Sequence, residues 1–377
     1  MGSFKKNLRV VAVFVLVYFF LLSIRLIGKG ASLLGEDFAR NLIATTSDPF
    51  VGLFIGILVT ALVQSSSLTT SLVVALIGGG VLSLSNAIPI IMGANIGTTV
   101  TNTLVALGHI SWRQEFRRAF AAGTMHDFFN ILTVLILFPL ELQFRYLTRL
   151  ALFLERFFET TGGIKFTSPF KVILSPVVAF LQHLFFKVLS LAPKFGGILM
   201  IVSGLCCLFV SLIFLVRLLR KLFIGKAEVL LDRYIFRNDL FAMFIGFFIT
   251  VIAQSSSLTI SVMVPLAGAG VLSSTRIFPY TMGANVGTTF TALLASLAIA
   301  GSGRSTAVAA ALAHLCFNMT GIAIFYPIKR IRNIPIYLSE KLALVCSKRR
   351  RFAFLYVITV FIVLPLTIIF LRRYMGR

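Results

Sequence analysis

Residues 64–69 read QSSSLT and residues 93–99 read GANIGTT, and both stretches return 190 positions further along, as QSSSLT and GANVGTT. Between residues 52–100 and 242–290, 26 of the 49 aligned positions are identical. Many of these identities fall on Gln, Ser, Thr, Asn and Gly, which lipid-facing segments normally exclude. Two copies of a polar, glycine-containing segment within apolar surroundings are typical of a transporter built from internal repeats.

The composition indicates a membrane protein. Apolar residues make up 58% of the 377 residues and charged residues 12%, about half the charged share of a soluble domain. The 35 Lys and Arg against 12 Asp and Glu give a net charge of +23. These basic residues gather at the ends of apolar runs, where they set topology and meet anionic lipid headgroups, so we expect membrane lipids and not nucleic acid as partners.

We expect an all-α polytopic membrane protein made of two inverted-topology repeats. Repeat unit 1 spans residues 1–140, a connecting and interfacial segment spans 141–195, and repeat unit 2 spans 196–326. Each unit is predicted to hold a first span, a re-entrant hairpin, an interrupted helix and a returning helix. In order, these are 10–27, 50–82, 87–107 and 119–140 in unit 1, and 196–216, 240–272, 278–298 and 305–326 in unit 2. A basic loop and a final span at 352–371 complete residues 327–377.

The hairpin prediction depends on length. Phe50 to Val63 is apolar but short for a crossing, and it meets Gln64 and three serines before a second short apolar run. Non-helical backbone at such a tip is tolerated where it is buried in protein or lines a cavity. One long helix from Phe50 to Ile77 is the alternative. With re-entrant hairpins each unit crosses the membrane three times, and because three is odd the second unit enters from the opposite side.

The repeated motif offers neutral ligands for ions. Hydroxyls, an amide and freed backbone N–H groups at a helix start suit an anion, whereas Asn and Thr oxygens suit an alkali cation. Serines and threonines that join helices, and membrane-edge histidines (His126, His314) that are simply hydrogen-bonded, are the structural alternatives. The candidate anion ligands are Gln64, Ser65, Ser66, Ser67, Gln254, Ser255, Ser256 and Ser257, with Arg117 and Arg118, whose alternative is a positive-inside signal. The candidate Na⁺ ligands are Asn95, Thr98, Thr99, Asn285, Thr288, Thr289, Thr69 and Thr259.

These residues carry a resemblance to a known family. The paired Gln-Ser-Ser-Ser motifs, the Gly-Ala-Asn runs, and the stretch from Gly93 through Phe116, Arg117 and Arg118 to Asn130 resemble the type II sodium-dependent phosphate cotransporters. The resemblance covers residues 50–140 and 240–340. It implies Na⁺-driven symport of inorganic phosphate by alternating access, with phosphate and Na⁺ held at the serine-rich tips and no organic cofactor. It also implies a multi-pass protein of the plasma membrane, or of the inner membrane in a bacterium, with a homodimer as an assembly to test.

One departure from the family bears on transported charge. Electrogenic animal members carry an Asp before the Phe-Arg-Arg segment, where this chain has Trp112. Two Na⁺ ions balance HPO₄²⁻, so we expect electroneutral transport, with Asp127 as the place for a further ion if it faces the cavity. Two other functions compete with this one. They are an intramembrane enzyme that uses a serine with His126 or His314, and a transporter of another tetrahedral oxyanion such as arsenate or sulfate.

Overall fold

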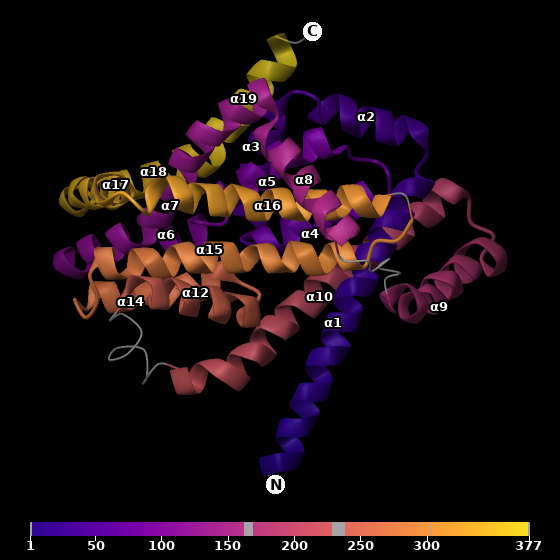
Figure 1. The fold of residues 1–377 in the computed structure, drawn as a ribbon, viewed down its shortest axis with the longest axis horizontal. Coiled ribbons are helices and arrows are strands. Elements are labelled where there is room, and N and C mark those ends of the chain that lie inside the picture. The colour runs from indigo at the N-terminus through magenta and orange to yellow at the C-terminus, as the bar shows by residue number, and fades with distance from the viewer. Residues whose placement is uncertain (1, 162–168, 228–237, 302, 376–377) are drawn as a thin grey trace.

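The computed structural model describes residues 2–161, 169–227, 238–301 and 303–375, and every regular element in these ranges is a helix (Figure 1). This agrees with the expected all-α membrane protein. The first half contains α1 (Gly2–Leu33), α2 (Glu36–Thr46), α3 (Pro49–Val63), α4 (Ser66–Gly78), α5 (Leu84–Gly97), α6 (Val100–Leu107), α7 (Arg113–Phe144) and α8 (Tyr146–Thr161).

The second half follows the same order after a short connecting segment. That segment contains α9 (Pro169–His183) and the π-helix η1 (Leu184–Val188). The helices of the second half are α10 (Pro193–Ala227), α12 (Asp239–Ala253), α13 (Ser256–Ser261), α14 (Met263–Gly268), α15 (Ser274–Leu297), α16 (Gly303–Phe325) and α17 (Lys329–Lys348). The chain ends with α18 (Arg351–Ile358), the π-helix η3 (Thr359–Val363) and α19 (Leu364–Met375).

Six helical segments of the described chain are long and apolar enough to cross a membrane. They are Val11–Leu33, Leu84–Leu107, Arg113–Phe144, Pro193–Phe214, Gly303–Phe325 and Arg351–Tyr374. Helices α2 and α3, bent by 96° at their junction, would make a seventh if they form one span. Helix α15 has 24 residues, as long as these spans, but its many Thr, Ser, Asn and Gly residues make it more polar.

Both Gln-Ser-Ser-Ser motifs break the helix in which they lie. Gln64 and Gln254 adopt the left-handed conformation, with φ of 56° and 53°, and so end α3 and α12. The next serine in each copy is extended and caps the following helix, because Ser65 Oγ accepts from Leu68 N and Ser255 Oγ accepts from Leu258 N, each at 3.2 Å. The alternative of one long helix from residue 50 to 77 is therefore wrong.

The two halves pack in the same way, and each half also packs on the other. Helix α3 lies against α5, and α12 lies against α15, through glycines that admit the neighbouring backbone. A Cβ added to Gly93 would lie 1.9 Å from Leu53 O, and one added to Gly283 would lie 1.8 Å from Met243 O, which is the equivalent pair. In the cross-packing, α4 contacts α15 and α16, while α13 and α14 contact α6 and α7. Helices α1 and α10, the first long helices of the two units, lie side by side (Figure 1).

The interrupted helix is interrupted in unit 1 alone. We expected a break in 278–298 as well, but α15 runs unbroken through the second motif. The reason lies in the contacts of Thr98. Its carbonyl accepts from Ser257 Oγ at 3.2 Å, and Asn102 N donates instead to the Thr99 carbonyl at 3.1 Å, which separates α5 from α6. The carbonyl of Thr288, the equivalent residue in α15, receives no such bond from Ser67 among the described contacts.

The segment after unit 2 also differs from expectation. We expected a basic loop between the returning helix and the final span, because Lys329 to Arg351 is dense in Lys and Arg. Residues 329–348 instead form α17, which packs along α7 as α8 packs along α16. Its lysines and Arg330 are exposed, whereas Ile336, Ala343 and Cys346 are buried. A helix with one apolar face accommodates the many charges on its other side, which explains why so basic a segment is helical.

Candidate functional site

The two Gln-Ser-Ser-Ser segments, which we call the tips, meet around Thr98. Ser66 Oγ donates to Thr98 Oγ1 at 3.2 Å, and the Thr98 hydroxyl lies 3.0 Å from Ser257 Oγ. Serines that are about 190 residues apart in the sequence therefore share one buried threonine. The sequence-predicted anion ligands Ser66 and Ser257 and the predicted cation ligand Thr98 thus belong to one cluster.

Ser67, which is equivalent to Ser257, contacts the other unit at a position that is offset along helix α15. Ser67 Oγ lies 3.1 Å from the Gln254 carbonyl and 3.3 Å from Thr291 Oγ1, which in turn donates to Gln254 Oε1 at 2.7 Å. Thr291 lies three residues, or one helical turn, beyond Thr288, the residue equivalent to Thr98. Gln254 is 8% exposed, whereas Gln64 is exposed. The two tips have the same sequence but different surroundings.

Each tip carries features of an anion site. A left-handed non-glycine residue costs about 1–3 kcal/mol and persists where the surrounding structure holds it, often at functional sites. Both glutamines are in this state. Helix α4 begins directly after the break, so the N–H groups of Ser66 and Ser67 have no intrahelical acceptor and face the tip with the positive end of the helix dipole. The tip therefore offers hydroxyl and N–H donors without a charged side chain.

Behind the tips lies a layer of Asn and His side chains that exchange hydrogen bonds between the units. His126 Nε2 lies 3.0 Å from Asn285 Oδ1, and His314 Nε2 lies 3.1 Å from Asn95 Oδ1. Asn285 Nδ2 also donates to Asn130 Oδ1 at 2.9 Å and to Asn318 Oδ1, on α16, at 2.6 Å. The two contacts are reciprocal, because a histidine of each unit contacts the equivalent asparagine of the other unit.

This layer changes the expected role of the two asparagines. Because Asn285 Nδ2 is a donor twice, its Oδ1 accepts the His126 Nε2–H proton, and His126 Nδ1 is then the acceptor for Asn102 Nδ2 at 3.4 Å. Asn95 Oδ1 is likewise engaged by His314 and, at 3.3 Å, by Asn318. In this conformation the amide oxygens of Asn95 and Asn285 serve the protein, and a Na⁺ ion would have to compete with a histidine for them.

The remaining predicted cation ligands turn their hydroxyl protons to their own helices. Five threonines donate to the backbone carbonyl three or four residues earlier, or lie within reach of it, so their lone pairs are what they can offer to an ion. They are Thr69, Thr99, Thr259, Thr288 and Thr289. Thr69 Oγ1 also accepts from Thr60 Oγ1 at 2.9 Å, and this bond connects α4 to α3.

The two predicted arginines lie elsewhere. Arg117 and Arg118 are exposed at the start of α7, and the guanidinium of Arg118 lies over Gly270, just after α14. Gly270 is separated from the Ser256 tip by the length of α13 and α14, on the order of 20 Å at 1.5 Å per residue. The structure does not bring these arginines to the hairpin tips.

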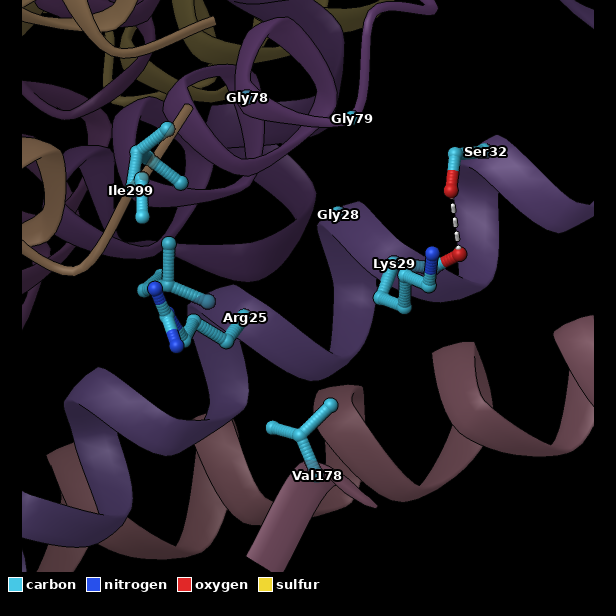
Figure 2. Close-up of a pocket in the computed structure, with 10 residues that line it drawn as sticks. Arg25, Gly28, Lys29, Ser32, Gly78, Gly79, Val178 and Ile299 are labelled. Carbon is cyan, nitrogen blue, oxygen red and sulfur yellow. Dashed lines mark hydrogen bonds between the residues drawn. The ribbon is translucent and has the colours of Figure 1, made fainter. Parts of the chain in front are cut away.

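A cavity of about 290 Å³ lies at the other end of α4 (Figure 2). Arg25, Lys29, Gly78 and Ile299 are among its lining residues. Arg25 donates to the carbonyl of Ala298 at 2.8 Å and also bonds a serine of α9, so its guanidinium caps the C-terminal end of α15. This explains a half-buried arginine in an apolar span without a substrate, and the cavity is not part of the tips.

Sequence reasoning left several polar residues of this centre without a role. Thr291, Asn130 and Asn318 are fully buried and bonded across the units, to Ser67, Asn285 and Asn95. The His-x-x-x-Asn spacing, present once in each unit, places both side chains on one helical face. That repeated spacing is the sequence pattern from which the layer of His and Asn side chains between the units could have been predicted.

The helices and this centre define a polytopic membrane protein with a duplicated, neutral polar core. The family model described as Na+/Pi-cotransporter matches residues 19–158 and 207–339, and the chain belongs to this family, whose members are transporters and not enzymes. Similar proteins include the sodium-dependent phosphate transport protein 2A of Ovis aries, 36% identical over 89% of this chain and 62% of the relative. Protein 2A of Rattus norvegicus is 34% identical over 96% of this chain and 67% of the relative. Protein 2B of Homo sapiens is 32% identical over 93% of this chain and 63% of the relative.

The chain thus spans about two thirds or less of the length of these relatives. No solved structure matches it.

Proposed function

We propose that the chain couples the movement of inorganic phosphate across the membrane to that of Na⁺, with both held at the paired hairpin tips. The observation that carries this proposal is the meeting of the two tips at Thr98, where Ser66 and Ser257 converge. Family membership supplies the substrate, because the similar proteins are named for sodium-dependent phosphate transport.

The charge of the substrate explains the need for sodium. A phosphate dianion held by hydroxyls and backbone N–H groups alone would carry its full charge into a medium of low dielectric constant. Hydroxyl lone pairs of threonines such as Thr99 and Thr289, which lie at equivalent positions, are hard ligands for Na⁺. Bound Na⁺ neutralises the dianion, so the loaded tips can cross as a neutral unit.

The two-fold exchange of contacts supports alternating access by inverted repeats. Unit 1 contributes three long helical segments (α1, α5 with α6, and α7), and unit 2 contributes three equivalent ones (α10, α15 and α16). Three crossings in each unit would place the units in opposite orientation. The exposed Gln64 and the buried Gln254 correspond to one end of the cycle, and the other end exchanges their environments.

The competing enzyme function lacks support in the geometry. A nucleophilic serine needs a base within hydrogen-bond reach. Among the described contacts, His126 bonds Asn102 and Asn285, and His314 bonds Asn95, so neither ring is bonded to a serine. Transport of arsenate or sulfate remains a matter for competition experiments, because hydroxyl and N–H donors recognise any tetrahedral oxyanion.

Radiolabelled phosphate uptake into proteoliposomes tests the proposal. We expect accumulation with an inward Na⁺ gradient and none when choline replaces Na⁺. Unlabelled sulfate in excess tests anion selectivity. Phosphate uptake that is equal with Na⁺ and with choline would refute sodium coupling. We place the protein in the plasma membrane, or in the inner membrane of a bacterium, surrounded by lipid, and cross-linking in native membranes would reveal a homodimer.

A further inference from the structure

Thr291 holds the second tip (residues 254–257) in place. Its hydroxyl donates to Gln254 Oε1 at 2.7 Å. Ser67 Oγ, from the first tip (residues 64–67), lies 3.3 Å from the Thr291 hydroxyl and 3.1 Å from the Gln254 carbonyl. The left-handed glutamine is therefore held through its side chain by a threonine of its own unit and through its carbonyl by a serine of the other unit.

Thr101, the equivalent residue of unit 1, makes none of these bonds. It lies 190 positions before Thr291, on α6, three residues beyond Thr98. Its hydroxyl oxygen is buried and has no hydrogen-bond partner, and Gln64, the equivalent of Gln254, is exposed. A buried hydroxyl without a partner costs free energy. The second unit shows which partners such a threonine can have, namely a tip glutamine and a tip serine.

The serines of the two tips occupy positions that differ by one helical turn. Ser257 contacts the hydroxyl of Thr98 at 3.0 Å and its carbonyl at 3.2 Å. Ser67 contacts Thr291, three residues beyond the equivalent of Thr98, which is about 4.5 Å along a helix. Each unit thus presents two threonines one turn apart, and a tip serine of the other unit lies at one of them.

We propose that the two positions are used alternately during transport, an inference that rests on the proposed alternating access. In the opposite state Ser257 lies at Thr101, and Gln64 accepts from the Thr101 hydroxyl and becomes buried. Ser67 lies at Thr288 in that state, so each tip has moved one turn along a helix of the other unit. Steps of one turn between packed elements are a known switching transition, because packed interfaces are bistable. Thr101 is thus a positioning residue for the first tip, as Thr291 is for the second.

The break between α5 and α6 has the same origin. The Thr98 carbonyl is engaged by Ser257, and Asn102 N donates to the Thr99 carbonyl at 3.1 Å instead. When Ser257 leaves Thr98, Asn102 N regains its ordinary acceptor, and the serine of the first tip can interrupt α15 at the equivalent carbonyl. The break therefore changes from one unit to the other with the state, which explains why only one of two similar sequences is broken here.

Disulfide cross-linking of the full-length chain tests the shift without any transport. The four native cysteines are replaced by alanine, cysteine pairs are introduced, and the chain is oxidised in its membrane. Two pairs report the shifted contacts, Ser67→Cys with Thr288→Cys and Ser257→Cys with Thr101→Cys. The matched controls pair the same serines with buried alanines about one turn away in the other direction, Ser67→Cys with Ala295→Cys and Ser257→Cys with Ala94→Cys.

We expect both shifted pairs to cross-link several-fold faster than their controls, because the chain visits the opposite state. Shifted pairs that cross-link no faster than the controls would overturn the inference.

Removal of the Thr101 hydroxyl is an independent test that needs no cysteine background. Because this hydroxyl has no partner in the present conformation, we expect Thr101→Val to raise the thermal midpoint. We also expect it to slow phosphate uptake about two- to tenfold, because the opposite state loses a hydrogen bond. Thr291→Val removes a bond that is present here, so its midpoint falls, and Thr101→Ser keeps the hydroxyl and transports like the wild type. Uptake by Thr101→Val at the wild-type rate would overturn the role of Thr101.

A failure of this inference and a failure of the proposed symport can be told apart. If the shifted pairs cross-link while the wild type shows no Na⁺-driven phosphate uptake, the one-turn shift stands and the symport falls. If wild-type uptake is Na⁺-driven and the shifted pairs match their controls, the symport stands and the one-turn shift falls.

Discussion

The four serines at the tips separate into two roles that alanine substitution can distinguish. Ser65 and Ser255 cap their helices, because each accepts a backbone N–H at 3.2 Å. Ser66 and Ser256 follow the caps, and Ser66 Oγ contacts Thr98. We expect alanine at any of the four to weaken phosphate uptake. Each hydroxyl that bonds the anion is worth about 1.5–3 kcal/mol, which is about a tenfold to 150-fold rise in the apparent KM for phosphate.

Stability adds a second readout. Removal of an N-cap costs about 0.5–2 kcal/mol of folding free energy. We therefore expect Ser65→Ala to lower the thermal midpoint as well as the affinity, and Ser66→Ala to lower affinity alone, since Thr98 keeps its contact with Ser257. The control is Ser65→Thr, which keeps a capping hydroxyl. An apparent KM for phosphate equal to that of the wild type in all four alanine variants would remove these serines from the site.

Four further predictions follow from other contacts. Alanine at Asn95 or Asn285 breaks the bond to a histidine of the other unit, and we expect it to raise the Na⁺ requirement more than the phosphate requirement; the opposite order in uptake titrations would assign these residues to the anion. Gly93→Ala places a Cβ 1.9 Å from a backbone oxygen of α3, so we expect a loss of about 1–3 kcal/mol in the free energy of unfolding, measured by thermal or denaturant melts. With two Na⁺ per HPO₄²⁻ we expect no steady phosphate-induced current in proteoliposomes; a current would require a further ion, worth about 2.3 kcal/mol per 100 mV for each charge moved. In single-cysteine variants we expect Gln64→Cys to react with a membrane-impermeant maleimide and Gln254→Cys to be protected in the same state, and equal labelling would contradict the observed asymmetry.

The sequence predicts the helices and their repeats well because the signal is local and duplicated. Apolar runs end at basic residues, and the motifs identify both helix breaks, at Gln64 and at Gln254. The pairing of residues between the units is not local. Identical serines meet Thr98 on one side and Thr291, one helical turn beyond the equivalent residue, on the other, and no pattern within either copy records that offset. The helix α17 was not predicted, because the dense positive charge of residues 329–348 indicated a loop and the apolar face between the charges was not considered.

The exchanged His–Asn pairs make each half of the molecule dependent on the other. A single unit in lipid would leave His126 Nε2 and Asn95 Oδ1 without their partners on the other unit, and an unsatisfied polar group there costs several kcal/mol. Two copies of unit 1 would meet the requirement equally well, since Asn95 occupies in unit 1 the place that Asn285 occupies in unit 2. The His–Asn layer therefore joins the two units of one chain by the kind of reciprocal contact that joins the subunits of a symmetric dimer.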